Sequence, residues 1–499
     1  MLHSFSALPT TLYSAAQVRA LDLRLIAAGT PGFALMQRAA DAAWRAVRQR
    51  WPDAGRLSVL AGSGNNAGDG YLLAALAQRS GWAVQVWAVG EPQQLHGDAA
   101  LALAEAQAAE VRILPWSGSA ELRGVLVDAL LGTGLSGPVR APYAAVIERI
   151  NAAGLPVLAL DIPSGLCADT GQVLGVAVQA TLTLTFIGLK IGLLTGEGPT
   201  SVGELLFDDL QADAVLVGQS PWSALRLDRP NLPVLPPRRP TTHKGQCGHV
   251  LVVGGDQGLG GAALLAAESA LRAGAGLVSL ATRAEHVLAA LARRPEIMSV
   301  GVASASALRP LVERASVLVV GPGLGQAAWG RSLLSLAAGC PVPQVWDADA
   351  LNLLAQGVVT LPEGCVLTPH PAEAARLLGL TTAQVQADRP AMARALAARF
   401  RAVVVLKGAG TLVASPQGDL ALCDHGHPAM ASAGLGDVLA GLLAALLGQG
   451  LSGYAAACLG VWLHACAGER LAVQGRGLLA SELPPVIRQL LEDHSPCLS

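Results

Sequence analysis

The sequence contains few charged and few aromatic side chains. Only 14% of its 499 residues are Asp, Glu, Lys or Arg, and only 4% are Phe, Trp or Tyr. An average soluble domain has about 25% charged residues. The formal net charge is −2, and because no basic excess is present we expect no nucleic-acid partner. The apolar residues are mostly Ala, Leu and Val, which excludes a disordered or coiled-coil chain.

The low charge raises the question of a membrane span. Residues 438–468 carry no charged side chain, and this run exceeds the roughly 20 residues that a spanning helix needs. Glycines interrupt it, and the segment 448–453 is typical of a turn between two buried helices. The first residues lack the basic and then apolar stretches of a secretory signal. We therefore expect a cytoplasmic protein that does not contact membranes.

Cysteine chemistry is also scarce. The 8 cysteines are scattered and form no C-x-x-C pair, which excludes a zinc ribbon and a disulfide scaffold. Free thiols in a cytoplasmic protein explain them best.

Two halves flank a proline-rich segment. Residues 221–240 contain prolines at a density that excludes a helix or a central strand. We predict a first domain over 1–222, a linker over 223–240 and a second domain over 241–499. Both halves alternate apolar runs with Ala- and Leu-rich helical patterns, which is typical of three-layer α/β domains with covered parallel sheets. The predicted strands are 57–62, 83–89, 124–130, 156–163, 181–188, 249–255, 276–282, 317–323, 365–370 and 402–408.

Polar residues follow three of the predicted strands in the first half. Asn65, Asn66 and Asp69 follow the first strand, Asp128 lies in the strand 124–130, and Asp161 precedes Ser164. Each acidic residue alone could cap a turn. Because ligands bind beyond the carboxyl ends of parallel strands, we expect these oxygens to converge. Such a set suits a hard cation better than zinc.

In the second half, Gly434 and Gly436 open a long predicted helix, and Asp437 stands in its first turn. Free N–H groups at this end would form an anion hole. Asp437 is either a base that takes a proton from a substrate hydroxyl or an acidic first-turn residue that stabilises the helix.

Lys407, at the end of a predicted strand, begins a glycine-rich turn through Thr411, a pattern that favours a nucleotide phosphate. The spacing is not that of a Walker A loop. Gly323 in the segment 321–325 and His370 between two prolines are weaker candidates for ligand contacts.

Several of these motifs resemble a known family. GSGNNAGDG (62–70), DALLGTGLSGP (128–138) and DIPSG (161–165) are similar to the Rossmann-like epimerase domain of the NAD(P)H-hydrate repair enzymes. TPHPAEAARLLG, KGAGT and GLGDV resemble the ribokinase-like, ADP-dependent NAD(P)H-hydrate dehydratase. The resemblance implies a bifunctional enzyme. Its first domain would interconvert the R and S hydrates, and its second would dehydrate the S form with ADP, giving NAD(P)H, AMP and phosphate.

The resemblance also implies roles for individual residues. Asp161 and Asp437 would be catalytic. K⁺ would bind Asn66, Asp128 and Ser164, and Mg²⁺ would accompany the nucleotide. The substrate contacts would be Asn65, Asn66, Ala67, Gly68, Asp69, Gly132, Thr133, Gly134, Leu135, Ser136, Gly137, Pro138, Tyr143, Asp161, Ala262, Gly323, His370 and Asp437. The adenine nucleotide contacts would be Lys407, Gly408, Ala409, Gly410, Thr411 and Gly436.

Some features depart from the family pattern or leave alternatives open. Ala67 replaces a usual Gly, and Ala429, Ala433 and Leu435 make the segment before Asp437 less glycine-rich, which affects nucleotide affinity most.

A small-alcohol or vitamin-precursor kinase fused to a nucleotide-binding regulatory domain is the main alternative. An NAD-dependent dehydrogenase fits less well, because the first strand is not followed by G-x-G-x-x-G. The residues do not distinguish ADP from ATP or NADH hydrate from NADPH hydrate. We also expect a homo-oligomer.

Overall fold

The computed structural model describes residues 7–498 and divides into two compact units, which meet between Leu225 and Arg226. A short strand, β10 (Ala224–Arg226), lies at this boundary and pairs antiparallel with β1 (Thr11–Tyr13). The proline density excluded a helix or a central strand over 221–240, whereas Ala224–Arg226 form this short strand. The flanking prolines, Pro221 and Pro230, lie outside β10, so they do not interrupt its hydrogen bonds.

The first unit contains a parallel sheet with the strand order β4-β3-β2-β5-β6-β7-β9. Its strands are β2 (Arg56–Ala61), β3 (Ala83–Ala88), β4 (Arg112–Pro115), β5 (Val125–Ala129), β6 (Val157–Leu160), β7 (Leu182–Phe186) and β9 (Glu204–Asp208), and β8 (Leu189–Lys190) pairs with β1. Its helices are α1 (Ala15–Ala27), α2 (Gly32–Arg50), α3 (Asn65–Arg79), α4 (Gly97–Ala108), α5 (Tyr143–Ala152), α6 (Gly198–Ser201) and α7 (Ala214–Gly218).

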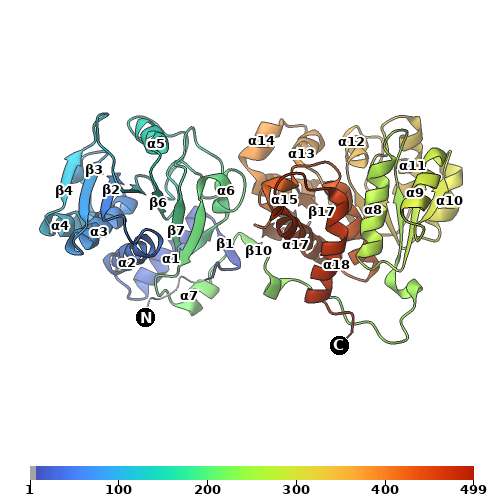
Figure 1. The fold of residues 1–499 in the computed structure, drawn as a ribbon, viewed down its shortest axis with the longest axis horizontal. Coiled ribbons are helices and arrows are strands. Elements are labelled where there is room, and N and C mark those ends of the chain that lie inside the picture. Colours follow the sequence, from blue (N-terminus) through green and yellow to red (C-terminus); the bar gives the residue numbers. More distant parts are fainter. Residues whose placement is uncertain (1–6, 499) are drawn as a thin grey trace. The chain divides into compact units, whose positions relative to one another are not determined.

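Helices cover both faces of this sheet (Figure 1). Alternate side chains of a strand point to opposite faces, and β2 shows this directly. Val59 belongs to a core that also includes side chains of α2, α3 and α4, whereas Leu60 belongs to a second core with side chains of α5. The predicted three-layer arrangement is therefore present in this unit.

The second unit has a sheet in which the strand order runs β13-β12-β11-β14-β15-β16-β17-β18-β19. The strands are β11 (His249–Val253), β12 (Leu277–Thr282), β13 (Met298–Gly301), β14 (Val317–Val320), β15 (Gln344–Trp346), β16 (Cys365–Leu367), β17 (Val403–Leu406), β18 (Thr411–Ala414) and β19 (Leu420–Cys423). Pairing is parallel from β13 to β17, and β18 and β19 join antiparallel.

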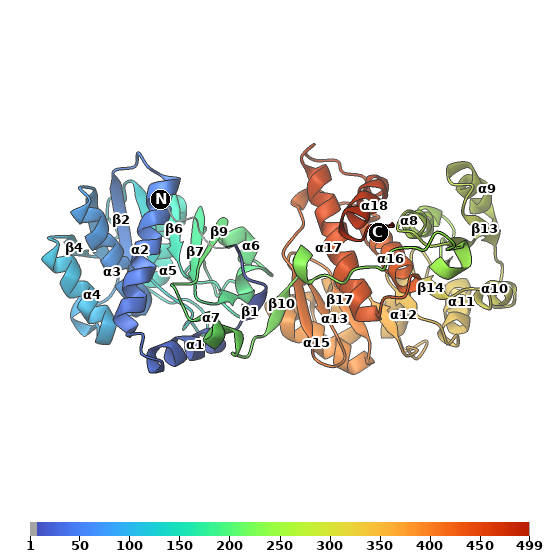
Figure 2. The same cartoon turned by 90° about the horizontal axis from the view of Figure 1, so that it is seen from below.

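The helices of the second unit are α8 (Gly260–Arg272), α9 (Ala284–Arg293), α10 (Ala305–Val312), α11 (Ala328–Ala338), α12 (Asp349–Ala355), α13 (Pro371–Leu378), α14 (Thr382–Ala387), α15 (Arg389–Phe400), α16 (Leu435–Gly448), α17 (Gly453–Ala472) and α18 (Leu483–His494). The uncharged run over 438–468 forms α16 and α17, which pack against each other as predicted, and α16 also packs on α8 (Figure 2). Among residues 7–498, no helix is both long and apolar enough to cross a membrane.

Candidate active sites

The first unit holds a cavity of about 580 Å³ at the carboxyl ends of its parallel strands. Loops that follow β2, β5 and β6 form much of its wall, which is where ligands bind in such sheets. Half of the predicted substrate contacts line this cavity. They are Asn65, Asn66, Asp69, Gly132, Thr133, Gly134, Leu135, Ser136 and Asp161.

Other residues of the predicted set do not line the cavity. Ala67 is fully buried in α3, and a Cβ on Gly68 would lie 2.6 Å from Sδ of Met36, so this helix face packs on α2. Neither Gly137 nor Pro138 is among the lining residues. The Tyr143 hydroxyl lies 3.2 Å from Oγ of Ser63, a residue that does line the cavity.

Asp128 and Ser164 are hydrogen-bonded to each other, and Ser164 and Asn66 both contact the Leu131 carbonyl beside this cavity. Both carboxylate oxygens of Asp128 accept from Ser164, one from its hydroxyl at 2.6 Å and one from its N–H at 2.7 Å. The carbonyl oxygen of Leu131 accepts from Nδ2 of Asn66 and from Oγ of Ser164, at 3.2 and 3.1 Å. Burial raises the pKa of Asp128 to about 6. Oδ1 of Asn66 is buried without a hydrogen-bond partner among the described residues, and an oxygen in that state suits a cation.

Asp161 follows β6 in a left-handed backbone conformation, with φ = 64°. Its Oδ1 accepts from the N–H of Phe186 at 3.2 Å, from the Thr185 hydroxyl at 3.3 Å and from Nζ of Lys190. Lys190 is fully buried. The strain at Asp161 is typical of a residue that the surrounding structure holds for function.

Lys190 was not predicted from the sequence. A signal was present, because it is the only charged residue between Thr181 and Thr195, and a buried lysine requires a partner. The sequence could not indicate which acidic residue that partner is.

A second set of charged residues surrounds the first turn of α16. Nζ of Lys407 lies 2.7 Å from Oδ1 of Asp347 and 4.0 Å from Oε2 of Glu373. A Cβ on Gly436 would lie 3.2 Å from the same Nζ and 3.3 Å from the other oxygen of Asp347. Lys407, predicted to contact nucleotide, therefore pairs with carboxylates beside the predicted anion hole. Asp347 and Glu373 were not predicted as site residues.

Burial and charge perturb the acid–base groups of this cluster. Burial, reinforced by Asp347, raises the pKa of Asp437 to about 7. Burial also raises the pKa of Glu373 to about 7, although Lys407 lowers it. Burial alone would lower the pKa of Lys407, but Asp347 and Glu373 outweigh it and raise the pKa. Asp437 can therefore be either protonated or ionised near neutral pH, as a catalytic base requires.

Arg389, which is almost fully buried, stabilises the turn that follows Lys407. Its guanidinium donates to the carbonyl oxygens of Lys407 and Gly410 at 3.3 and 3.4 Å. Thr411 closes the turn with a hydrogen bond from its hydroxyl to the carbonyl of Gly408 at 2.9 Å. The predicted nucleotide segment, which includes Ala409, is thus a rigid turn.

The remaining predicted residues fall into two places. Ala262 and Gly323 are adjacent, since a Cβ on Gly323 would lie 3.4 Å from the Cβ of Ala262. His370 caps α13, because its Nδ1 accepts from the N–H of Ala372 at 3.1 Å. Its Nε2 lies 3.4 Å from Oε1 of Glu373, which brings it to the Lys407 cluster. The sequence suggested a ligand contact for His370, and the structure adds a capping role.

His464 is a further residue that the motifs did not single out. His464 lies on α17, and its Nε2 lies 3.0 Å from the carbonyl oxygen of Leu435 at the start of α16. Burial lowers the pKa of His464 to about 4, so this histidine is neutral near pH 7 and fixes the first turn of α16 by a hydrogen bond.

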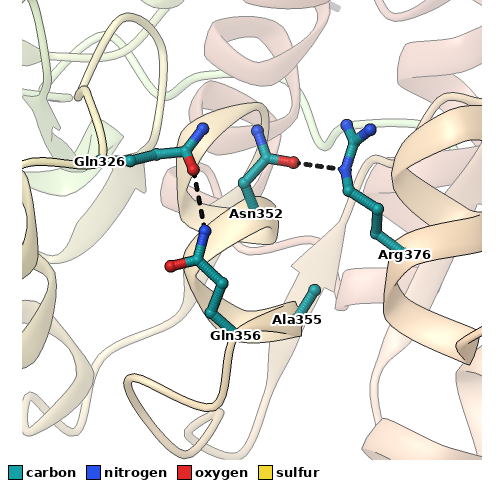
Figure 3. A pocket seen from close by; sticks show the side chains of 5 residues that line it. All are labelled: Gln326, Asn352, Ala355, Gln356 and Arg376. Carbon is teal, nitrogen blue, oxygen red and sulfur yellow. Dashed lines mark hydrogen bonds between the residues drawn. The ribbon is translucent and has the colours of Figure 1, made fainter.

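The second unit also has an open hollow of about 510 Å³ (Figure 3). Nε2 of Gln356 donates to Gln326 at 2.9 Å, and Nε of Arg376 donates to Asn352 at 2.8 Å. None of these residues was predicted as a site residue. Their side chains pair with one another, so the hollow presents no unsatisfied group that points to a ligand.

Comparison with known proteins identifies the family. A sequence model of NAD(P)H-hydrate dehydratase matches residues 250–488, and one described as YjeF-related protein N-terminus matches residues 32–192. The bifunctional NAD(P)H-hydrate repair enzyme of Coxiella burnetii is 45% identical, covering 97% of this chain and 99% of its own. The chain belongs to the bifunctional NAD(P)H-hydrate repair enzymes.

A repair enzyme from Escherichia coli is 42% identical over 92% of this chain and 89% of its own length. Among solved structures, a ribokinase-like superfamily protein from Enterococcus faecalis is similar with a TM-score of 0.51 and 29% identity, covering 54% of this chain and 96% of its own. Membership of the repair enzymes confirms the resemblance drawn from the motifs and the order of the two enzyme halves. The structural similarity confirms the ribokinase-like fold of the second half.

Proposed function

We propose that the first unit interconverts the R and S forms of NADH or NADPH hydrate, and that the second dehydrates the S form with ADP as the phosphoryl donor. The products would be NAD(P)H, AMP and phosphate. The main support for the proposed dehydratase activity is the position of Asp437, which lies at a helix N-terminus beside Asp347, Lys407 and Glu373.

In the first unit, epimerisation requires a proton to move at the ring hydroxyl or the ring nitrogen, and Asp161 is the proposed acid–base residue. Among residues 7–498, the hydrogen bonds to its carboxylate all end on Oδ1, which leaves Oδ2 for a substrate. Lys190 is the proposed positioning residue, since its buried ammonium pairs with the carboxylate and holds it in place.

A potassium ion would be held by Asn66, Asp128 and Ser164. The orphaned Oδ1 of Asn66 and the buried Asp128 carboxylate fit a hard cation of low charge. When bound, the ion would supply positive charge next to the loop 132–136. Asn66 and Ser164 already share the Leu131 carbonyl, so they hold the start of that loop in place.

In the second unit, Asp437 would take the proton of the C6 hydroxyl as that oxygen attacks the transferring phosphoryl group. The N–H groups of the first turn of α16 would stabilise the phosphoryl oxygens. Elimination of phosphate, driven by the ring nitrogen, then restores the nicotinamide ring. Lys407 lowers the pKa of Asp437 and so keeps this base ionised more often.

The adenine nucleotide would lie against the turn Lys407–Thr411 and Gly436, and Ala262, Gly323 and His370 would face the hydrate. Magnesium, bound through the nucleotide phosphates, would neutralise their charge during transfer.

We also propose domain limits of 1–222 and 241–499 with a linker at 223–240, a cytoplasmic location and a homo-oligomer. Light scattering of the purified chain tests the oligomer directly.

One experiment tests the proposed function. The full chain is given each purified hydrate epimer with ADP or ATP, and nicotinamide absorbance, AMP and phosphate are followed. We expect the S form to be converted directly and the R form after epimerisation. A stable phosphorylated product without recovery of absorbance would contradict dehydration and favour the small-alcohol kinase. Conversion of the R form at only the uncatalysed rate would contradict epimerisation.

A further inference from the structure

We propose that Asp22, on α1, is a second catalytic residue of the epimerase site and exchanges a proton with the C6 oxygen of the hydrate as the partner of Asp161. This inference rests on the proposed epimerisation. Asp22 lies outside every motif described above, and it reaches the site from a different element than Asp161.

The position of α1 brings Asp22 to the cavity. The helix begins where the N–H of Ala15 donates to Oδ1 of Asp169 at 2.6 Å. One turn further on, Arg19 donates from Nη1 to the carbonyl of Thr133 at 3.3 Å, which ties α1 to the loop after β5. Asp22, nearly one turn beyond Arg19, lines the same cavity as Asp161. Residues on α1 thus form a wall of the proposed substrate site.

The two carboxyl groups have different surroundings. Oδ1 of Asp161 is saturated by Lys190, Thr185 and Phe186. Oδ1 of Asp22, in contrast, is buried without a hydrogen-bond partner among the described residues. A buried, unpartnered carboxyl oxygen is costly unless a bound molecule or proton satisfies it. Pairs of carboxyl groups with unequal environments divide acid and base roles between them.

The charge balance of the cavity favours a proton on Asp22. The charged residues of the cavity wall are Arg19, Asp22, Asp69, Asp98, Asp161 and Lys190. Lys190 is engaged by Asp161. Burial raises the pKa of Asp22 to about 6, Lys190 lowers it and Asp161 raises it further. Burial, Asp161 and Asp22 hold the pKa of Asp69 well above its usual range. Asp22, with a pKa of about 6, can gain and lose a proton near neutral pH.

The proposed step balances without a further reactant. Asp22 donates its proton to the C6 hydroxyl, the C6–O bond breaks and water leaves as the ring-nitrogen lone pair forms a planar iminium. Water then adds to the other face of C6 and gives a proton to Asp161. The opposite direction exchanges the two roles, as microscopic reversibility requires. Between turnovers, solvent returns the proton from one carboxyl group to the other.

The test compares Asp22→Asn with Asp53→Asn in the full chain. Asp53 is an exposed aspartate of the first unit that does not line the cavity. For Asp22→Asn we expect R-to-S conversion to fall by about 10²–10⁴-fold while dehydration of the S epimer is unchanged, which also shows that the chain folds. Asp53→Asn should keep both activities. In the wild type, R-to-S conversion should decline above about pH 6, and Asp22→Asn should lose that decline while Asp22→Glu restores it.

The outcomes separate this inference from the function on which it rests. If the wild type does not epimerise, the proposed function fails. If the wild type epimerises and Asp22→Asn does so equally well, or loses activity with an unchanged pH profile, Asp22 is not the proton donor. Loss of the pH limb in Asp69→Asn instead would assign the role to Asp69. Conversion in ¹⁸O-labelled water should place the label on C6, and full retention of the original oxygen would overturn the proposed C–O cleavage.

Discussion

Nζ of Lys407 lies 2.7 Å from Oδ1 of Asp347, beside the first turn of α16. This pair places two opposite charges close to Asp437: Lys407 lowers the pKa of Asp437, whereas burial and Asp347 raise it more. The ion pair and the helix N-terminus therefore act together on the proposed base of the dehydratase.

The first prediction concerns the pH dependence of dehydration. Because Asp437 must be ionised to accept a proton and its pKa is raised to about 7, dehydration should accelerate as the pH rises through 7. Lys407→Met removes the charge that lowers this pKa, so the rise should move to higher pH. The rate of S-hydrate conversion between pH 5.5 and 9 measures both effects. An unshifted profile in Lys407→Met would contradict the assigned base.

The second prediction concerns stability. The pKa of Asp437 rises from 3.8 in the unfolded chain to about 7 in the folded one. Its stabilising contribution is therefore complete below about pH 4 and is lost as the pH rises through 7. Asp437→Asn should raise the free energy of unfolding at pH 8 by about 1–2 kcal/mol, discounted for partial exposure, while dehydration falls by about 10²–10⁴-fold.

Thermal unfolding at pH 8 and pH 4 checks the stability effect, which should be present only at pH 8. The exposed Asp493→Asn serves as the control and should change neither stability nor activity. A destabilised Asp437→Asn at pH 8 would show that burial does not strain this carboxylate.

The third prediction concerns potassium. Replacement of K⁺ by choline should slow epimerisation and leave dehydration of the S hydrate unchanged. Ser164→Ala removes a proposed ligand and a hydrogen bond to Asp128, so it should make epimerisation slow and insensitive to K⁺. Ser58→Ala, a buried serine of β2 that donates to the carbonyl of Arg123, is the matched control and should retain K⁺ activation. Equal rates in both salts would argue against the site.

The fourth prediction concerns Lys190. Lys190→Met removes the buried ammonium that holds Oδ1 of the Asp161 carboxylate in place. Epimerisation near pH 7 should then fall by about 10–10³-fold. Steady-state rates with the R hydrate measure this, and the exposed Lys244→Met is the control. Full activity at pH 7 would show that Asp161 does not depend on its ion pair.

Much of the fold could be predicted from the sequence because covered parallel strands are continuous apolar runs. The predicted strands 57–62 and 402–408 overlap β2 and β17. The edge strands β4 and β13 were missed, since most of their side chains are exposed or half-buried. The hairpin of β18 and β19 was also missed, because apolar content does not reveal that the sheet changes to antiparallel pairing.

Some of the candidate site residues could likewise be predicted from the sequence, whereas others could not. Asp128, Asp161 and Asp437 could be predicted as site residues because they stand at the ends of regular elements inside recognisable motifs. Asp22 and Lys190 were not predicted, because α1 and β8 carry no glycine-rich motif and their relation to Asp161 exists only in three dimensions. A buried charge reveals that a partner is needed, whereas the identity of that partner depends on the fold.

The position of α1 affects how the first unit can be isolated. The match to the family model of the first half begins at residue 32, whereas α1 spans Ala15–Ala27 and also contributes Val18 and Leu21 to the hydrophobic core. An expression fragment that starts at residue 32 would retain the sheet and the Asn66–Asp128–Ser164 cluster, but it would lose one wall of the cavity together with Asp22. Such a truncation should bind potassium and yet fail to turn over the R hydrate, so gene fragments for this half must extend upstream of the matched region.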